Sequence, residues 1–444
     1  MRLTDVLFIV VGLSAPALAI PQFDIVPVGL TPDGLSNQAR GLNDAGQVTG
    51  FDNITGGFQR ATFGPGAVMG NAGLPAYTTP VTSSEGHAIN NNGIVVGVAR
   101  YSAPPPGSAT GSVPYDRGIA FNTQTNQYLA VLEPFNDAGG RRAFAQAINN
   151  QNRVVGNGSS DPVLTNQNPR RAFWYDVSPS QPAVNYKLDP AVNGLPFLPG
   201  GSWSVAYDIN DNQQIAGFAQ APDDTSPTPV NRNRAVIWDA GTPDPNGNPY
   251  TSVTRIDTRN TPGTSSLARS INDSGVTVGR MSFSTTSGDE AAFVYRPGDA
   301  SITSLGFFGG TRTEAIDIGN NGWIVGYAGV TEGNSTPTNR ALLWLPDAGG
   351  VAGYVAYDLN SLITLGSVAT GGWTRLLEAR AVNDDGTIVG YGRFVATPGG
   401  AEVTRGFVLT VVPEPATVAV MCLGTAGALL RRRRPLQRGM PAKG

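Results

Sequence analysis

Cysteine, histidine and lysine are the scarcest chemistry-bearing residues of this chain of 444 residues. The only cysteine is Cys422, near the C-terminus, so the body of the chain has no disulfide and must be stabilised by packing. The only histidine is His87, and the lysines are Lys187 and Lys443. One histidine and one tail cysteine argue against a nucleophilic triad or a histidine-based metal site, so we predict a structural or surface role for His87.

Long helices and a basic face are also missing. Gly and Pro together supply 91 residues, too many for long helices, and no strong helical period precedes residue 416. No glycine-rich phosphate-binding loop opens a helix. Residues 20–410 carry 23 Lys and Arg against 31 Asp and Glu, a net charge of −8. This balance argues against nucleic acid as a partner and suits a soluble protein outside the cell.

The N-terminus has the pattern of a secretory signal peptide over residues 1–19. A charged start at Arg2 precedes the apolar run VLFIVVGL, and small residues at Ala17 and Ala19 form the predicted cleavage site. Such a segment is removed in the mature protein, so it takes no part in the fold that we predict.

The C-terminal segment 411–436 combines three features in order. Pro413, Glu414 and Pro415 precede an apolar run over 416–430, and a basic block follows, made of Arg431, Arg432, Arg433 and Arg434. As a short hydrophobic helix the run would rise about 22 Å, less than the ~30 Å hydrocarbon core of a bilayer. The arginine block stays on the cytoplasmic side. We therefore predict a temporary membrane anchor.

This segment resembles the PEP-CTERM sorting signal of exported proteins of Gram-negative bacteria. The resemblance implies an exosortase-type sorting machinery as partner and transient anchoring in the inner membrane. It places the mature protein at the outer cell surface or in the extracellular space.

Seven copies of a twelve-residue pattern run through the body without gaps. Their closing glycines are spaced by 47 to 64 residues. The copies are ARGLNDAGQVTG (39–50), GHAINNNGIVVG (86–97), AQAINNQNRVVG (145–156), AYDINDNQQIAG (206–217), ARSINDSGVTVG (268–279), AIDIGNNGWIVG (315–326) and ARAVNDDGTIVG (379–390).

Each copy predicts a tight β-hairpin. An apolar β-former precedes Asn-Asp or Asn-Asn, and a glycine that favours positive φ closes the turn. Asn152 and Gln213 replace this glycine in copies three and four. Because glutamine adopts positive φ poorly, we predict a different turn in copy four. The first residue of each copy is Ala or Gly, which lets a neighbouring sheet approach closely.

A third strand follows each hairpin, as in RRAFWY (170–175) and NRALLW (339–344), and a fourth apolar segment usually comes next. Four strands in each of seven units predict an all-β fold, a seven-bladed β-propeller. The seventh unit lacks a fourth strand before the tail, so we predict that FDIVPVGL (23–30) closes the ring beside 404–409. An arginine recurs at the start of the third strand, for which we predict a structural role: Arg60, Arg117, Arg171, Arg234, Arg340 and Arg405.

The same residues resemble the extracellular HAF-repeat family. INNNGIVVG, RAFWY and SLGFFGG follow one another in that family's order, with arginine in place of its usual histidine. The resemblance covers residues 20–410 and implies an exported, propeller-like protein with no established activity.

No residue emerges as a catalytic, cofactor-binding or metal-binding group, and we expect no cofactor. Calcium binding stays an alternative at NDDG (383–386) and NDSG (272–275), although the residues that a tight turn requires explain these sequences better. We expect a monomeric binding or structural protein, with extracellular polysaccharide as a possible ligand at the long loops 98–116, 157–169, 220–233 and 328–339. The alternative is a polysaccharide-acting hydrolase or lyase that uses loop carboxylates, from Asp161, Asp223, Asp224, Asp289, Glu332 and Glu402.

Overall fold

The protein is all-β over the part of the chain that the computed structural model describes. Within that part, the single helix is the 3-10 turn η1 (Leu359–Ser361), and no helix is long and apolar enough to cross a membrane. The predicted signal peptide and the predicted hydrophobic helix of the tail lie outside the described residues. These are 20–32, 34–64, 67–68, 81–103, 112–135, 141–159, 170–180, 184–223, 230–259, 261, 263–283, 288–331, 338–363 and 372–413.

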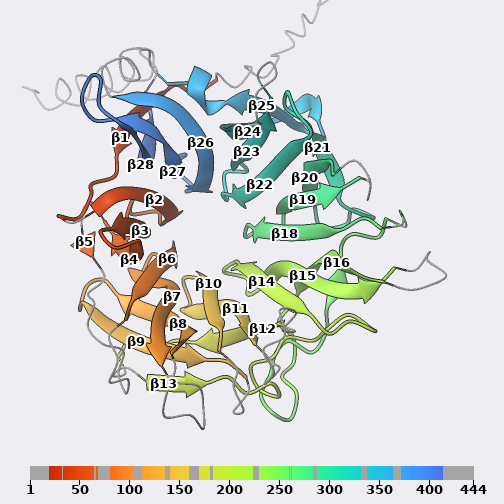
Figure 1. Ribbon diagram of the computed structural model, residues 1–444. Helices are drawn as coiled ribbons and strands as arrows, with labels where there is room; N and C mark the ends of the chain where they lie inside the picture. Colours follow the sequence, from red (N-terminus) through yellow and green to blue (C-terminus); the bar gives the residue numbers. More distant parts are fainter. Residues whose placement is uncertain are drawn as a thin grey trace, which may run out of the picture.

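The seven repeats form small antiparallel sheets arranged around a common centre, with the first strand of each repeat innermost (Figure 1). The first strands are β2 (Gly34–Leu42), β6 (Ser83–Ile89), β10 (Ala143–Ile148), β14 (Ser204–Ile209), β18 (Ser266–Ile271), β22 (Arg312–Ile318) and β26 (Trp373–Val382). The second strands are β3 (Val48–Ile54), β7 (Ile94–Ala103), β11 (Arg153–Ser159), β15 (Ile215–Pro222), β19 (Thr277–Ser282), β23 (Ile324–Val330) and β27 (Ile388–Val395).

The third strands confirm the predicted segments. They are β4 (Phe58–Phe63), β8 (Val113–Asn122), β12 (Arg170–Asp176), β16 (Asn231–Trp238), β20 (Glu290–Tyr295), β24 (Thr338–Val351) and β28 (Glu402–Val411). The remaining strands are β1 (Phe23–Pro27), β5 (Ala67–Val68), β9 (Gln127–Glu133), β13 (Val184–Lys187), β17 (Thr254–Arg255), β21 (Thr303–Gly306) and β25 (Tyr354–Asp358).

The fourth strands depart from the expected regular pattern. In the third repeat the sheet is β10-β11-β12, and the segment that follows, β13, pairs in parallel with β9 of the second repeat instead. One parallel pair, Glu290 with Arg312, joins the sheets of the fifth and sixth repeats. The prediction of four strands in every unit is therefore wrong for the third repeat, where the chain reaches back to the outer edge of its neighbour.

All seven hairpin turns have the same backbone geometry. The turn residue has positive φ in each copy, including Asn152 (65°) and Gln213 (62°). The N–H of Gln213 donates to Asn210 O at 3.1 Å, as the glycines do in the other turns. The prediction of a different fourth turn is thus wrong. The bonds that its flanking strands and neighbouring repeats impose outweigh the preference of glutamine for negative φ.

A β-bulge follows the first residue of every repeat motif. The first residue pairs with the closing glycine, as Ala39 with Gly50, and the ladder skips the second residue before it resumes. The backbone is so close here that a Cβ on Gly50 would lie 2.0 Å from Gln38 O. Only glycine fits this position, which explains why all seven copies end in glycine.

Polar side chains join five of the repeats to the repeat before them. In each of these five pairs, the hydroxyl or amide oxygen two residues before the motif accepts the N–H of a small residue in the third strand of the preceding repeat, at 2.7–3.0 Å. The acceptors are Asn37, Ser84, Ser204, Ser266 and Thr313, and the donors are Gly406, Ala61, Ala172, Ala235 and Ala292.

The recurrent arginine is a structural residue at four of its positions. Arg117, Arg171 and Arg234 donate to backbone carbonyls, and Arg340 pairs with Asp358 at 2.7 Å. These bonds confirm the predicted role there, because each guanidinium is used to hold the chain of its own or the next repeat.

Asparagines of the hairpin turns link the repeats into a closed ring. Asn43 donates to Asn90 O at 2.9 Å, and the same side-chain-to-backbone bond continues through Asn90, Asn149, Asn210 and Asn272. In the sixth repeat Gly319 occupies this position, and Asn321 donates to Asn383 O instead. The ring closes where Asn383 donates to Asn43 O at 3.4 Å.

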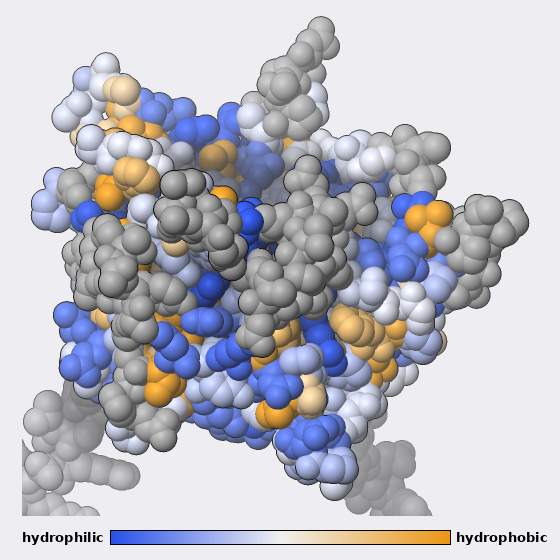
Figure 2. Space-filling model, turned by 60° about the horizontal axis from the view of Figure 1, so that its bottom comes forward, coloured by the Kyte–Doolittle hydropathy of each residue, from blue (hydrophilic) through white to orange (hydrophobic). Residues whose placement is uncertain are grey.

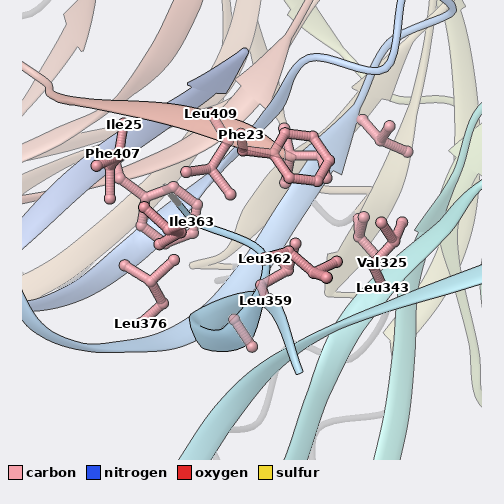
Figure 3. Packing of buried hydrophobic residues seen from close by; sticks show 14 of the residues in the cluster. Phe23, Ile25, Val325, Leu343, Leu359, Leu362, Ile363, Leu376, Phe407 and Leu409 are labelled. Atoms are coloured by element: carbon pink, nitrogen blue, oxygen red, sulfur yellow. The ribbon is translucent and has the colours of Figure 1, made fainter. Parts of the chain in front are cut away.

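The N-terminal strand closes the seventh repeat, as predicted. β1 is antiparallel to β28, with pairs running from Phe23 and Val411 to Pro27 and Phe407. Phe23 is fully buried in a cluster with Leu409, Leu362 and Ile363 (Figure 3). The segment therefore covers an edge that β28 would otherwise expose, and it fills a core between the sixth and seventh repeats.

Candidate functional site

The first strands of all seven repeats surround a central cavity of about 510 Å³. Each strand contributes the residue at its β-bulge, the second position of the repeat motif. This position varies between copies, whereas the position before it is always Ala or Gly, and its side chains line the cavity: Arg40, His87, Gln146, Tyr207, Arg269, Ile316 and Arg380. The volume lies within the range of small-molecule sites.

Ion pairs occupy the part of the cavity farther from the hairpin turns. Arg40 pairs with Glu85 at 2.7 Å, Arg380 with Glu378 at 3.0 Å, and Arg269 with Glu314 at 2.6 Å. Each pair sets a carboxylate beside a bulge arginine, so the guanidinium groups are held in place.

Glu314 is the most enclosed of these carboxylates. Burial alone would raise its pKa, but the charges of Arg269 and Arg280 hold the pKa of Glu314 below its usual value. Tyr327 also donates to Glu314 at 2.9 Å, and Arg269 lies over the ring of Tyr207 at 4.4 Å. Glu314 is therefore ionised and fixed at neutral pH.

His87 lies at the wall of this cavity. Its Nδ1 is 2.8 Å from Ala145 O in the next repeat, and its Nε2 is 3.8 Å from Glu85. Both nitrogens thus have protein partners, which is consistent with the predicted structural role. Its position beside Arg40 in the cavity is a property that the sequence pattern did not indicate.

Two carboxyl groups share one serine hydroxyl closer to the turns. Ser270 Oγ is 2.7 Å from Asp208 Oδ2 and 2.7 Å from Asp317 Oδ1. The backbone N–H groups of Ile271 and Val382, from the repeats that follow, each donate to one of these carboxyls at 2.9 Å. A serine hydroxyl has one proton and can donate to only one acceptor, so a proton on either carboxyl completes the bridge.

Burial raises the pKa of both carboxyls. For Asp317, burial and the nearby charge of Asp208 raise the pKa to about 6. For Asp208, burial is the main cause, and the charge of Asp273 adds to it. The bridge therefore gains a proton in mildly acidic solution, well above the ordinary pKa of a carboxyl group.

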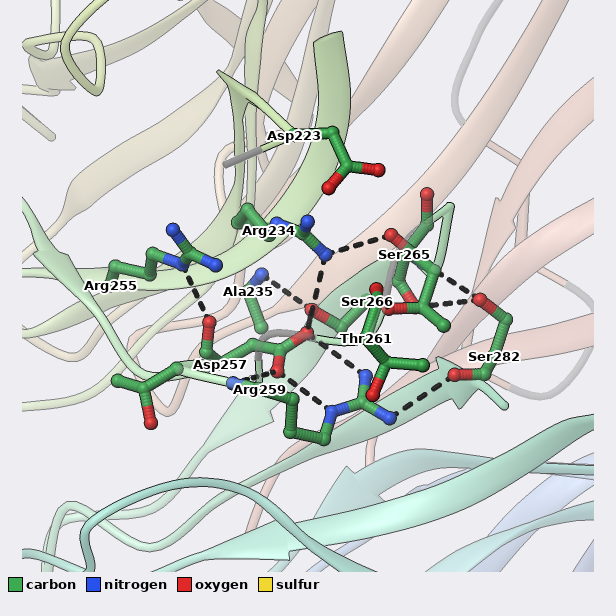
Figure 4. Close-up of polar contacts among 12 residues, drawn as sticks. Asp223, Arg234, Ala235, Arg255, Asp257, Arg259, Thr261, Ser265, Ser266 and Ser282 are labelled. Atoms are coloured by element: carbon green, nitrogen blue, oxygen red, sulfur yellow. Dashed lines mark hydrogen bonds and ion pairs between the residues drawn. The ribbon is translucent and has the colours of Figure 1, made fainter. Parts of the chain in front are cut away.

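A second buried charge cluster joins the fourth and fifth repeats (Figure 4). Asp257 is fully buried and receives a bidentate pair of bonds from Arg259 at 2.8 and 2.9 Å, together with the hydroxyl of Ser266 at 2.6 Å. Burial opposes ionisation, but Arg259 and Ser266 hold the pKa of Asp257 below its usual value. Since Arg234 is also buried here and bonds to Thr264 O, we assign the cluster a structural role.

The turn acids are engaged in bonds between repeats. Asp211 Oδ1 accepts the N–H of Asn150 at 2.8 Å, and Asp273 Oδ1 accepts the N–H of Asp211 at 2.9 Å. Asp384 Oδ1 accepts the N–H of Asn320 at 2.9 Å. Among the described residues no group of three or more His, Cys, Asp or Glu side chains could hold a metal ion.

The structure separates the loop acids that the sequence offered for chemistry. Asp223, which follows β15, accepts the N–H of Gly263 at 2.6 Å. Glu402 lies in the separate sheet of the seventh repeat, where it accepts the hydroxyl of Thr374. Asp161, Asp224 and Glu332 lie outside the described residues, as do most residues of the four long loops. In the view of Figure 2 hydrophobic residues form separate small areas and no broad patch.

Comparison with known proteins identifies the tail and leaves the activity of the body open. Residues 411–434 match the PEP-CTERM protein-sorting motif, which marks an exported protein directed to the surface. Residues 202–420, just under half of the chain, match a family described as "Protein of unknown function (DUF3466)". No curated protein matches the chain. The HAF-repeat resemblance stays a prediction.

Proposed function

We propose that the protein is a surface-directed, seven-bladed β-propeller that binds a polar ligand, of the saccharide class, in its central cavity. The ring of asparagine bonds and the closure of the last repeat by β1 support the propeller architecture. The observation that carries the binding role is the bulge position. Seven equivalent sites on one rigid scaffold present seven side chains, of five different types, to one cavity.

The chemistry of the cavity favours a hydroxyl-rich ligand. Guanidinium, carboxyl, amide and phenol groups from different repeats converge there, and they can donate to and accept from sugar hydroxyls. Gln146 extends from the wall of the cavity and is half-buried. This assignment moves the expected site from the long loops to the bulge residues.

Substitution in the cavity tests the binding role. Glycan-array binding by the purified body (residues 20–412), followed by titration with the best glycan, should show at least a tenfold loss of affinity for Arg380→Gln and a smaller loss for Gln146→Ala. Gln127→Ala, on the exposed end of β9, is the matched control and should bind as the wild type does. Equal affinity of all these proteins would place the site outside the cavity.

The second candidate function is that of a hydrolase, and it rests on the bridge formed by Asp208, Ser270 and Asp317. Two carboxyl groups that each lie 2.7 Å from one hydroxyl share a cavity, as a pair of catalytic acids must. Both, however, also accept backbone N–H groups that join the repeats. If the protein is a hydrolase, its incubation with extracellular polysaccharides generates new reducing ends. The Asp208→Asn variant should then fold normally and generate none.

The tail supplies a test of sorting. Replacing the four arginines at 431–434 by glutamine should release more protein into the medium, because the basic block no longer stops the chain at the membrane. Mass spectrometry of cell fractions measures the amount and the ends of the protein. Intact protein that begins at Met1 and stays in the cytoplasm would contradict the proposal, whereas replacing Arg393, an exposed arginine of the body, should change nothing.

A further inference from the structure

Both ends of the folded body lie at the end of the ring that carries the hairpin turns, here named the turn face. A Cβ on Gly386, in the turn of the seventh repeat, would lie 3.3 Å from Val411 Cγ2 and 2.8 Å from the ring of Trp323, in the turn of the sixth repeat. Phe23 lies against Trp323 as well, with ring centroids 6.3 Å apart. Val412 N donates to Gln22 O at 2.8 Å, so the two ends leave side by side.

The direction of the strands explains this position. The first strand of each repeat runs toward its turn, the second runs away from it, and the third runs back. β28 is a third strand, so it ends at the turn face. The hairpin between β27 and β28, residues 396–401, lies at the opposite end, here named the loop face. Since β27 has eight residues, the two ends of its sheet are about 26 Å apart.

We infer that, while the tail is in the membrane, the turn face lies against the bilayer and the loop face points away from it. From Val412 to Ala416, where the apolar run begins, the chain advances four residues, and no chain conformation can span more than about 14 Å over that length. This reach is shorter than the ring is thick. The loop face therefore cannot meet the bilayer while the body is folded.

The charge of the turn face indicates that the tail, and not the face itself, attaches the protein to the membrane. Asp44, Asp211, Asp273 and Asp384 lie at the turns, and the basic block of the sequence lies beyond residue 430. Four carboxylates are repelled by anionic lipid head groups, so the face itself has no affinity for such a membrane. The ligand must then enter the central cavity from the loop face, which is the exposed end. This inference rests on the proposed engagement of the membrane by the tail.

Site-specific quenching tests the orientation in the full chain. Cys422→Ser removes the native thiol, and either Ala45→Cys, at the turn face, or Ala396→Cys, at the loop face, introduces a label site. Both alanines are exposed, and their repeats are neighbours in the ring. Each protein is labelled with one fluorophore and reconstituted into vesicles of phosphatidylethanolamine and phosphatidylglycerol that contain a lipid with a nitroxide on its head group.

We expect the label at position 45 to be quenched several-fold more strongly than the label at position 396. Equal quenching, or stronger quenching at position 396, overturns the inferred orientation. Flotation of the vesicles separates this failure from that of its premise. If the full chain does not float with them, the tail does not hold the membrane, and the inference is overturned together with that part of the proposed function. A chain that ends at Val412 is the control and should neither float nor be quenched.

Discussion

Removal of residues 23–30 is expected to lower the free energy of unfolding of the body by several kcal/mol. The deletion removes the ladder between β1 and β28 and exposes the whole edge of β28. It also removes Phe23, which is fully buried, together with Ile25 and Val28, which are 9 % exposed. Each such side chain stabilises the folded state by about 1.5–3 kcal/mol. Chemical denaturation followed by tryptophan fluorescence measures the loss.

A single substitution tests the same prediction if the protein without residues 23–30 does not fold. Phe23→Ala should cost about 3–5 kcal/mol because it leaves a cavity between the sixth and seventh repeats. Phe58→Ala makes the same chemical change at a side chain that is 46 % exposed, and it should cost less than about 1 kcal/mol. Equal losses for the two variants would contradict the role of β1 in closing the ring.

Asp317→Asn is expected to stabilise the protein at pH 8 by about 1–3 kcal/mol. The pKa of Asp317 is about 6 in the folded state, above its ordinary value of 3.8. Between these values the folded protein binds more protons than the unfolded chain does. The stability of the wild type should therefore fall as the pH rises from 4 to 6, and it stays reduced above pH 6.

Asparagine at position 317 carries no charge and so avoids the loss of stability that ionisation of the buried carboxyl causes. Its amide can also make the hydrogen bonds that the carboxyl makes. Its oxygen can accept the N–H of Val382, and its NH₂ group can donate to Ser270 Oγ, which leaves the serine proton for Asp208. The melting temperature at pH 5 and pH 8 measures both effects. Asp44→Asn, at an exposed turn, is the matched control and should leave the pH profile unchanged. A variant that follows the wild-type profile between pH 4 and 8 would show that Asp317 is not the titrating group.

The local structure was readable from the sequence because short-range chemistry governs it. The Asn-rich turns need positive φ, the closing glycines leave no room for a Cβ, and most third strands are apolar runs that follow an arginine. The pairing of β1 with β28 was readable as well, because the seventh repeat had no other segment to cover its edge. Gln213 shows the limit of this reasoning. Its residue type opposed the turn, and contacts with neighbouring repeats decided the conformation.

The site could not be predicted, because it depends on how seven repeats meet. A β-bulge in each first strand turns the second motif residue toward the axis, and only the closed ring sets Arg40, His87 and Arg380 around one cavity. The bridge between Asp208 and Asp317 needs residues 109 positions apart, and no local pattern indicates it. By itself the sequence determined the repeat, the β-hairpins and the sorting motif at the C-terminus. The tertiary structure alone decided which side chains face one another, since distances between repeats follow from packing around the axis.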